Sequence, residues 1–234
     1  MPQASTVRAE KTLAHGMIVY HFLNEEFGLQ SLQKKRLKVS IADDLNDPFE
    51  HLAIELGDKE LRGAMTRMLR GLAKRQGLIC FSKSWRSPVM WSHYADRHEG
   101  ICLGFEIPKE LLSKVSYQND RLPYQSDIFD SDPESAAEVM LKLATTKFSA
   151  WSYENEWRVF TDLAETTEEN GLHFVSYSER LQLKEIIVGH HSAVTRQQIE
   201  DLVAVQDDRP DYFKARPAFK SFRMTRQKNH SLWK

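Results

Sequence analysis

Short apolar segments recur along this chain, and the sequence between several of them is too short for a regular helical crossover. The segments rich in β-prone residues span 17–23, 37–41, 77–81, 101–107, 173–177 and 183–188. Such short apolar runs, bounded by polar residues, indicate buried β-strands. Because parallel strands need connections of a dozen or more residues, this spacing favours an α+β fold over a doubly wound parallel sheet.

Amphipathic segments that predict helices lie between some of these strands. Three of them begin with a short polar residue followed by proline, which is typical of a helix N-terminus: Asp47-Pro48, Ser87-Pro88 and Asp132-Pro133. We therefore expect helices over about 48–75, 88–98 and 133–145, and a fourth over about 195–203. Glu50 stands at the third position of the first helix, where its carboxylate can accept a bond from the backbone N–H of the cap.

The length of 234 residues suits a single large domain, because no stretch rich in glycine, serine and proline divides the chain. We expect an N-terminal extension over 1–16, one α+β domain over 17–212 and a basic C-terminal segment over 213–234. The last segment holds seven Lys or Arg residues and no Asp or Glu, and its interleaved aromatic residues are Phe213, Phe219, Phe222 and Trp233. Such a segment either contacts phosphates or is a solvated terminus.

The charge balance and the cysteine content restrict function and location. With 32 basic and 33 acidic residues, the net charge of −1 gives no overall field to attract nucleic acid or an anionic membrane, so any such binding must be local. The cysteines are Cys80 and Cys102 alone, which excludes a disulfide framework and a cysteine-rich zinc site. No apolar run has the length of a membrane span and the start does not read as a secretory leader, so we expect a cytoplasmic protein without a membrane partner.

Two neighbouring glutamates form the strongest candidate for chemistry. Residues 151–160 alternate large and polar side chains, which predicts a strand with Glu154, Glu156 and Arg158 on one face. Repulsion between two close carboxylates, together with the nearby aromatic residues, would raise the pKa of one of them, as in acid–base sites. The alternative is a solvated strand face on which Glu156 pairs with Arg158.

Each of the other candidate site residues also has a purely structural interpretation. His21 is the one titratable group of the first apolar strand, and it is either a site residue or a satisfied core histidine. Trp91 and Tyr94 share a helical face and are either core aromatics or a platform for a ligand. Ser82 and Ser84 either close a strand or enter the site.

An acidic run gives one candidate for a metal site. It consists of Asp43, Asp44, Asp47, Glu50 and His51, and such a cluster can hold a divalent ion in a nuclease. Helix capping already accounts for Asp47 and Glu50, so we expect no metal site here.

Six short motifs follow one another in a specific order and spacing. They are Val19-Tyr20-His21, Asn46-Asp47-Pro48-Phe49-Glu50, Cys80-Phe81-Ser82, Met90-Trp91-Ser92-His93-Tyr94-Ala95-Asp96, Gly100-Ile101-Cys102 and Glu154-Asn155-Glu156-Trp157-Arg158. In this order they resemble the bacterial domain-of-unknown-function 2971 family, and the resemblance extends from about residue 17 to residue 190. The family brings no established activity with it.

A second and looser resemblance concerns three polar positions. His21 lies on the first strand, Ser82-Lys83-Ser84 or Tyr94 follows a middle strand, and Glu156 lies on a later strand. This order resembles the core of ADP-ribosyltransferases. Residues 156–159 and 183–188 are similar to the catalytic strand and the next strand of DNA-modifying members of the DarT type, and Glu154 matches the first glutamate of the E-x-E in arginine-modifying members.

The second resemblance implies an α+β fold with a split, mixed or antiparallel β-sheet core, and an enzyme that transfers ADP-ribose from NAD to a protein or nucleic acid. It implies that Glu156 stabilises the oxocarbenium-like ribose and that Glu154 orients or deprotonates the acceptor. The residues implied for binding NAD are His21, Tyr20, Ser82, Ser84, Trp91, Tyr94 and Arg158.

The same resemblance implies a bacterial toxin or phage-defence effector with a cognate antitoxin or partner protein. Two alternatives remain open. The first is an NAD hydrolase or a nucleotide-binding protein without transfer. The second is a non-catalytic module that binds nucleic acid or protein through the basic segment 213–234.

Overall fold

The fold is organised around one large mixed β-sheet. The structure is a computed structural model, and it describes residues 16–41, 44–50, 52–124, 132–204 and 209–233. Across the sheet the strands are β13 (Met224–Arg226), β12 (Asp211–Pro217), β11 (Gln182–Val188), β4 (Ile101–Pro108), β1 (Gly16–Leu23), β3 (Gln76–Ser82), β8 (Glu156–Asp162) and β5 (Ser113–Lys114). Neighbours are antiparallel except β11 and β12, which are parallel. The predicted α+β fold with a mixed, largely antiparallel sheet is confirmed.

Smaller elements surround this sheet. A three-stranded sheet contains β2 (Arg36–Val39), β10 (Leu172–Ser176) and β9 (Thr167–Glu169), and a two-stranded one contains β6 (Ser116–Gln118) and β7 (Thr146–Phe148). The α-helices are α1 (Glu25–Lys34), α2 (Lys59–Ala73), α3 (Pro88–Tyr94), α4 (Pro133–Ala144) and α5 (Arg196–Val203). The 3₁₀-helices are η2 (Lys109–Leu111), η4 (Ser149–Glu154), η5 (Leu163–Glu165) and η6 (His230–Leu232).

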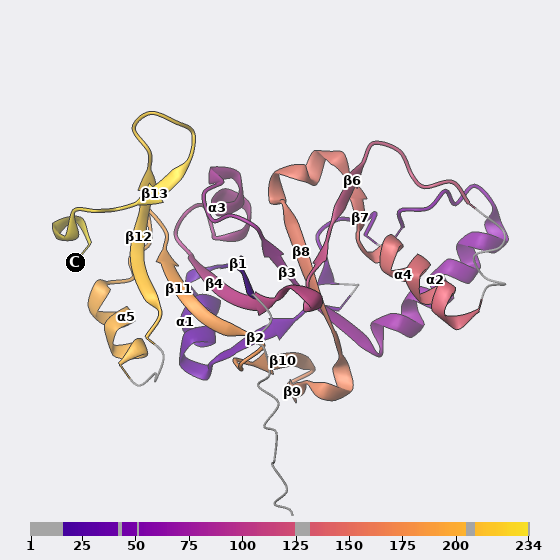
Figure 1. Cartoon of the computed structure of the whole chain (residues 1–234), viewed down its shortest axis with the longest axis horizontal. Coiled ribbons are helices and arrows are strands. Elements are labelled where there is room, and N and C mark those ends of the chain that lie inside the picture. The colour runs from indigo at the N-terminus through magenta and orange to yellow at the C-terminus, as the bar shows by residue number, and fades with distance from the viewer. Residues whose placement is uncertain (1–15, 42–43, 51, 125–131, 205–208, 234) are drawn as a thin grey trace, which may run out of the picture.

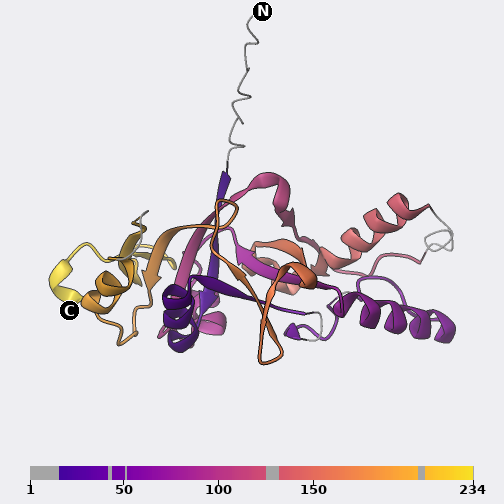
Figure 2. The ribbon, with the colours of Figure 1, turned by 90° about the horizontal axis from the view of Figure 1, so that it is seen from below.

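The helices lie at different ends and faces of the sheet. Figures 1 and 2 both show α2 and α4 side by side at one end of the molecule, with α5 and the C-terminal strands at the other end. Between α2 and α4 lies a small apolar core that includes Leu61, Met65 and Leu143. At the other end, α5 and the C-terminal strands pack into the two larger clusters of the central sheet.

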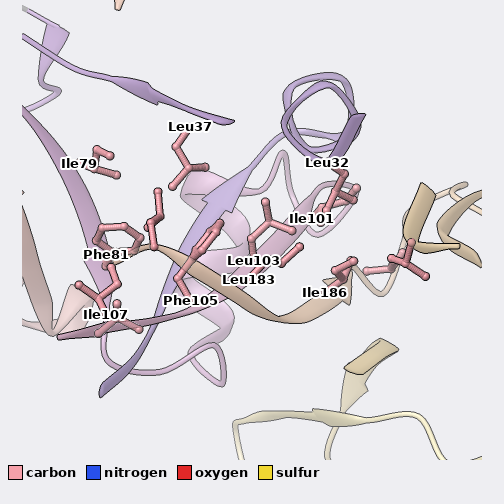
Figure 3. Close-up of a cluster of buried hydrophobic side chains, with 14 of the residues drawn as sticks. Leu32, Leu37, Ile79, Phe81, Ile101, Leu103, Phe105, Ile107, Leu183 and Ile186 are labelled. Atoms are coloured by element: carbon pink, nitrogen blue, oxygen red, sulfur yellow. The ribbon is translucent and has the colours of Figure 1, made fainter. Parts of the chain in front are cut away.

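Alternation along the strands gives the sheet two buried faces. On one face, Leu103 and Phe105 of β4 and Ile186 of β11 belong to the main hydrophobic core, which α1 covers with Leu32 (Figure 3). On the other face, Cys102 of β4 packs in a second cluster around α3. Period-2 burial on both faces explains why these strands are nearly continuous apolar runs in the sequence.

The sheet is split between β1 and β3. These two strands share a single pair of Cα partners, Tyr20 and Ser82, whereas β1 pairs with β4 over its full length and β3 does so with β8. Farther along β3, Leu78 pairs with Ser40 and not with a residue of β1. The Ser40 N–H donates to the Leu78 oxygen at 2.9 Å, and the Leu78 N–H donates to the Ser40 oxygen at 2.8 Å. The His21 ring bridges the opening, with Nδ1 2.8 Å from the backbone oxygen of Cys80.

The helix predicted over 48–75 is wrong in its first third. Asp47 caps only a turn, accepting a bond from the N–H of Phe49 at 3.0 Å, and α2 begins at Lys59 with Asp58 as its N-cap. Residues 52–57 form no helix, and the N–H of Glu55 bonds to the carbonyl of Leu122 next to an isolated bridge between Ile54 and Leu122. Glu50 is not part of a capping box, and its carboxylate instead binds a buried arginine, as described below.

The helix predicted over 88–98 ends earlier, at Tyr94. Asp96, Arg97 and His98 have φ angles of 43°, 52° and 75°, so they lie in the left-handed region and cannot continue a right-handed helix. The N–H of Gly100 still bonds to the carbonyl of Ala95, which closes the helix end onto β4. The helices predicted over 133–145 and 195–203 are confirmed as α4 and α5.

The basic segment 213–234 begins inside a strand of the main sheet. β12 crosses the expected boundary at residue 212 and pairs in parallel with β11 through Tyr212 and Phe213. Phe213 and Ala215 are buried in the cluster around α3. The interpretation of this segment as a solvated terminus is therefore wrong for β12.

We expect Gly189→Ala to destabilise the fold. A Cβ at Gly189 would lie 2.2 Å from the backbone oxygen of His98 and 2.7 Å from that of Gly100, and backbone atoms cannot give way easily. The free energy of unfolding, measured by urea denaturation, should fall by about 3 kcal/mol.

Gly71→Ala is the matched control for this substitution. Gly71 lies in α2, and a Cβ there would meet nothing within 4 Å. This substitution should stabilise the protein by about 0.5–1 kcal/mol, because alanine loses less backbone entropy in a helix. Equal effects at Gly189 and Gly71 would contradict the close approach of the backbones.

Candidate functional site

A cavity of about 120 Å³ lies beside the split between β1 and β3. Elements distant in sequence line it: β1, β3, α3, β7, the end of η4, β8 and the turn around Glu50. The predicted site residues that line it are Tyr20, His21, Ser82, Tyr94, Glu154, Glu156 and Arg158. The structure thus brings together most of the positions singled out from the sequence.

Two predicted site residues do not line the cavity. Trp91 is fully buried in the cluster around α3, and its indole N–H donates to the backbone oxygen of Trp85 at 2.6 Å. Ser84 lies just beyond β3, where its hydroxyl accepts a bond from the N–H of Arg86 and its own N–H donates to the Ser82 hydroxyl. For Trp91 the core interpretation fits the structure.

The two glutamates approach each other through a helical turn and not through a continuous strand. The strand predicted over 151–160 is wrong in its first half, because η4 ends at Glu154 and Asn155 has a left-handed conformation with φ of 45°. The Ser82 hydroxyl donates to the backbone oxygen of Glu154 at 2.6 Å. The N–H of Lys83 donates to the backbone oxygen of Asn155. These bonds to the end of β3 hold the turn, and β8 starts at Glu156.

A buried arginine organises the floor of the cavity. The Arg158 side chain is 0% exposed and forks onto Glu156, with Nε 2.8 Å from Oε1 and Nη2 3.1 Å from Oε2. Its Nη1 lies 2.6 Å from Glu50 Oε1 and donates to the backbone oxygen of Ala144 at 2.6 Å. The predicted pairing of Glu156 with Arg158 is present, but the strand face is buried and not solvated.

Lys147 from β7 links all three carboxylates. Its Nζ lies 2.6 Å from Glu154 Oε2, 3.2 Å from Glu156 Oε2 and 4.0 Å from Glu50 Oε2. The side chains of the three glutamates are 4–5% exposed. The cluster therefore places three acidic and two basic groups out of solvent, which leaves an excess of one negative charge when all are ionised.

The two central glutamates have different acidities. Burial would raise the pKa of Glu156, but the charge and hydrogen bonds of Arg158 and the charge of Lys147 lower it to about 2. For Glu154 burial dominates, and its pKa is raised although Lys147 and the Tyr94 hydroxyl favour the ionised form. The sequence predicted one raised pKa in this pair, and the structure assigns it to Glu154.

Tyr94 and Tyr20 have their hydroxyl groups engaged by carboxylates. The Tyr94 hydroxyl donates a short bond to Glu154 Oε1, and the Tyr20 hydroxyl reaches across β4 to Glu185 Oε2 of β11 at 2.8 Å. Burial and the neighbouring carboxylates raise the pKa of both phenols, so they are protonated donors. The ring of each lines the cavity.

His21 is neutral and has a defined tautomer. Burial lowers its pKa, and only partial compensation comes from the bond to the backbone of Cys80. Because a carbonyl oxygen can only accept, Nδ1 carries the proton, and Nε2 remains an acceptor on a ring that lines the cavity. His21 thus joins the two halves of the sheet and contributes to the cavity wall.

Sequence reasoning missed Lys147, Glu50 and Tyr117. The Tyr117 hydroxyl accepts a bond from the N–H of Glu156 at 2.9 Å, and Lys147 belongs to no motif. Glu50 lies in the motif Asn46-Asp47-Pro48-Phe49-Glu50, where helix capping was an adequate explanation. A motif whose terminal glutamate forms an ion pair cannot be distinguished from a capping box by residue spacing alone.

A larger groove of about 720 Å³ adjoins the cavity and shares His21, Phe22, Asn46 and Tyr94 with it. Three basic residues of α1 and β2 line this groove: Lys34, Arg36 and Lys38. Arg36 also lies over the ring of Phe174, 3.8 Å from its centroid. Lys34 and Arg36 are ion-paired with Glu169, and Lys38 with Asp44. The groove therefore places ion-paired basic side chains and aromatic surface next to the acidic cluster.

Neither a metal site nor a membrane-spanning helix occurs in the described part of the chain. Within it, His, Cys, Asp and Glu form no group of three or more that could hold an ion. Two members of the acidic run, Asp43 and His51, lie outside the described residues. Among the described helices, none is both long and apolar enough to cross a membrane.

Residues 90–159 match the family described as "Protein of unknown function (DUF2971)". The match includes most of α3, β4, η4 and the start of β8, and it confirms the family resemblance for the three motifs that lie within it. No curated protein and no solved structure matches the chain significantly. The resemblance to ADP-ribosyltransferases therefore stays a prediction.

We expect Arg158→Met to destabilise the protein strongly. Its loss leaves Glu156 and Glu50 buried without their main partner. The free energy of unfolding in urea should fall by about 3–5 kcal/mol. Arg196→Met, which removes the solvent-accessible pair with Glu200, should leave it nearly unchanged. A change of unfolding free energy in Arg158→Met as small as that in Arg196→Met would show that the stability of the cluster does not depend on the Arg158 charge.

The acidity of Glu156 predicts how stability depends on pH. Its pKa is about 2 in the folded protein and near the ordinary value of 4.5 when unfolded, so the unfolded state binds the proton more readily. Its contribution is complete above about pH 5 and decreases as the pH falls toward 2. In Glu156→Gln this part of the acid-induced loss should be absent, and equal pH slopes of unfolding free energy in the two proteins would contradict the assignment.

Proposed function

We propose that this chain is an enzyme that cleaves the N-glycosidic bond of NAD and transfers ADP-ribose to a macromolecular acceptor. The observation that carries the proposal is that the ionised carboxylate of Glu156 and the neutral ring of His21 line one cavity at the split of the sheet. Glycosidic cleavage passes through an oxocarbenium-like state, which a fixed carboxylate stabilises.

The charge of the cluster suits the donor. The nicotinamide ring of NAD is cationic, and the ribosyl group becomes cationic as the bond breaks. Three carboxylates with two cations give the cavity a small negative excess that favours both species. In the adjoining groove the two phosphates would replace Glu169 and Asp44 as partners of Lys34, Arg36 and Lys38.

The chain's residues divide the chemistry between them. Arg158 and Lys147 hold Glu156 in one orientation, and Glu156 stabilises the positive charge on the ribose. When the bond from the ribose carbon to the ring nitrogen breaks, both electrons stay with nicotinamide, which leaves as a neutral molecule. An oxygen or nitrogen of the acceptor then bonds to that carbon and releases its proton to Glu154, whose raised pKa suits a general base.

The test is release of nicotinamide from NAD by purified protein, with and without bacterial lysate as a source of acceptors. Glu156→Gln should lower the rate by about 10²-fold or more, because the charge facing the ribose is lost. Glu168→Gln, in the exposed strand β9, is the control and should leave the rate unchanged. Circular dichroism must show that Glu156→Gln is folded at the assay temperature.

Glu154→Gln separates transfer from hydrolysis. We expect it to keep nicotinamide release and to lose incorporation of labelled ADP-ribose into macromolecules, because only the acceptor needs the base. Release without incorporation by the unmodified protein would make it an NAD hydrolase. No release, together with no shift of the melting temperature by NAD, would refute the proposal.

A further inference from the structure

The turn between β12 and β13 carries two fully exposed aromatic side chains. Phe219 is 90% exposed and Phe222 is 100% exposed, more than any other large hydrophobic residue of the described chain. The turn is closed by a bond from the N–H of Ala218 to the backbone oxygen of Arg223 at 2.9 Å. In Figure 1 this loop projects from the end of the molecule that holds the C-terminal strands. Single exposed apolar side chains are common on protein surfaces, but two fully exposed rings three residues apart on one turn form an apolar surface that indicates a contact site.

The base of this hairpin is fixed to the body of the protein. Phe213 packs edge-on against Trp85 with ring centroids 5.3 Å apart, and Met224 is buried in the same cluster. The N–H of Met224 donates to the backbone oxygen of Arg86 at 2.8 Å. The two exposed rings are therefore presented by an ordered support, which lowers the entropy that binding would cost.

The tip of the hairpin also carries cations. Arg216 lies over the ring of Phe219, 4.2 Å from its centroid, Lys220 stands between the two phenylalanines, and Arg223 follows them. In the part of the chain that the structure describes, none of these three cations forms a salt bridge. By contrast, Arg226 at the base of the hairpin is paired with Asp211.

We propose that the β12–β13 hairpin tip binds single-stranded nucleic acid. A single strand presents unpaired bases alternating with phosphates, and the tip presents phenylalanine rings alternating with Lys and Arg. The local positive charge supplies the attraction that the net charge of −1 does not. This surface is separate from the cavity and does not depend on the reaction proposed above.

A membrane surface fits the tip less well. Insertion of both rings into lipid would also bury Lys220, which lies between them in the sequence, away from water. A nucleic acid strand instead places a phosphate beside such a cation while the bases stack on the rings.

The experiment measures fluorescence anisotropy of labelled single-stranded DNA and RNA oligonucleotides of about 16 nucleotides. The full chain should bind, with an affinity that falls as salt rises. The double substitution of Phe219 and Phe222 by leucine should weaken binding by about tenfold or more, because leucine keeps the apolar surface but offers no ring for stacking. The double substitution by tryptophan should restore it.

Two controls complete the design. Lys220→Gln with Arg223→Gln should reduce the dependence of affinity on salt, whereas Leu232→Ala, at an exposed apolar residue outside the turn, should change nothing. Because the substituted rings are exposed, the melting temperature should be unchanged in every variant. The relative affinity for DNA and RNA then identifies which of the two the tip prefers.

Other outcomes would overturn the proposal. The first is that the full chain binds no oligonucleotide, and the second is that the leucine variant binds with undiminished affinity. The third is that an unlabelled duplex competes for binding as well as an unlabelled single strand does. If the full chain binds no oligonucleotide, and both it and the leucine variant float with phosphatidylserine vesicles, the tip binds a membrane surface instead.

Discussion

The interaction on which the site depends is the burial of Arg158. A guanidinium group with no exposure must find acceptors for its donors inside the protein, since an unpaired buried charge costs several kcal/mol, on the order of 3–5. Those acceptors come from Glu156 on the same strand, Glu50 in a turn, and the last residue of α4, Ala144. One side chain thus fixes the relative positions of β8, the turn at Glu50 and the end of α4, and the cavity lies beside them at β3.

The ion cluster explains why the two glutamates differ although they are neighbours. Glu156 receives the fork of the arginine and stays ionised, while Glu154 has a lysine and a tyrosine hydroxyl and keeps a raised pKa. Environment, and not residue type, therefore assigns one group to stabilise charge and the other to take a proton. This division is the physical basis of the reaction that we propose.

The sequence predicted the strands well where burial on both faces makes a continuous apolar run, as in β4 and the second half of β11. The prediction was wrong where a local pattern is compatible with two backbone conformations. The alternation over 151–160 fits a strand, but residues 149–154 form a 3₁₀-helix. The Ser82 hydroxyl donates to the backbone oxygen of Glu154 at the end of this helix. Lys147 could not be predicted, because its role arises only when β7 places it between carboxylates from other elements.

The split of the sheet has a mechanical consequence. One pair of Cα partners and one imidazole ring join β1 to β3, whereas continuous ladders hold β1 to β4 and β3 to β8. The seam between the two halves therefore has fewer backbone hydrogen bonds than the ladders on either side of it. His21 and Tyr20 lie on one side of that seam, Glu156 and Arg158 on the other. The width of the cavity is therefore the dimension that a bound molecule can change with the least loss of backbone hydrogen bonds.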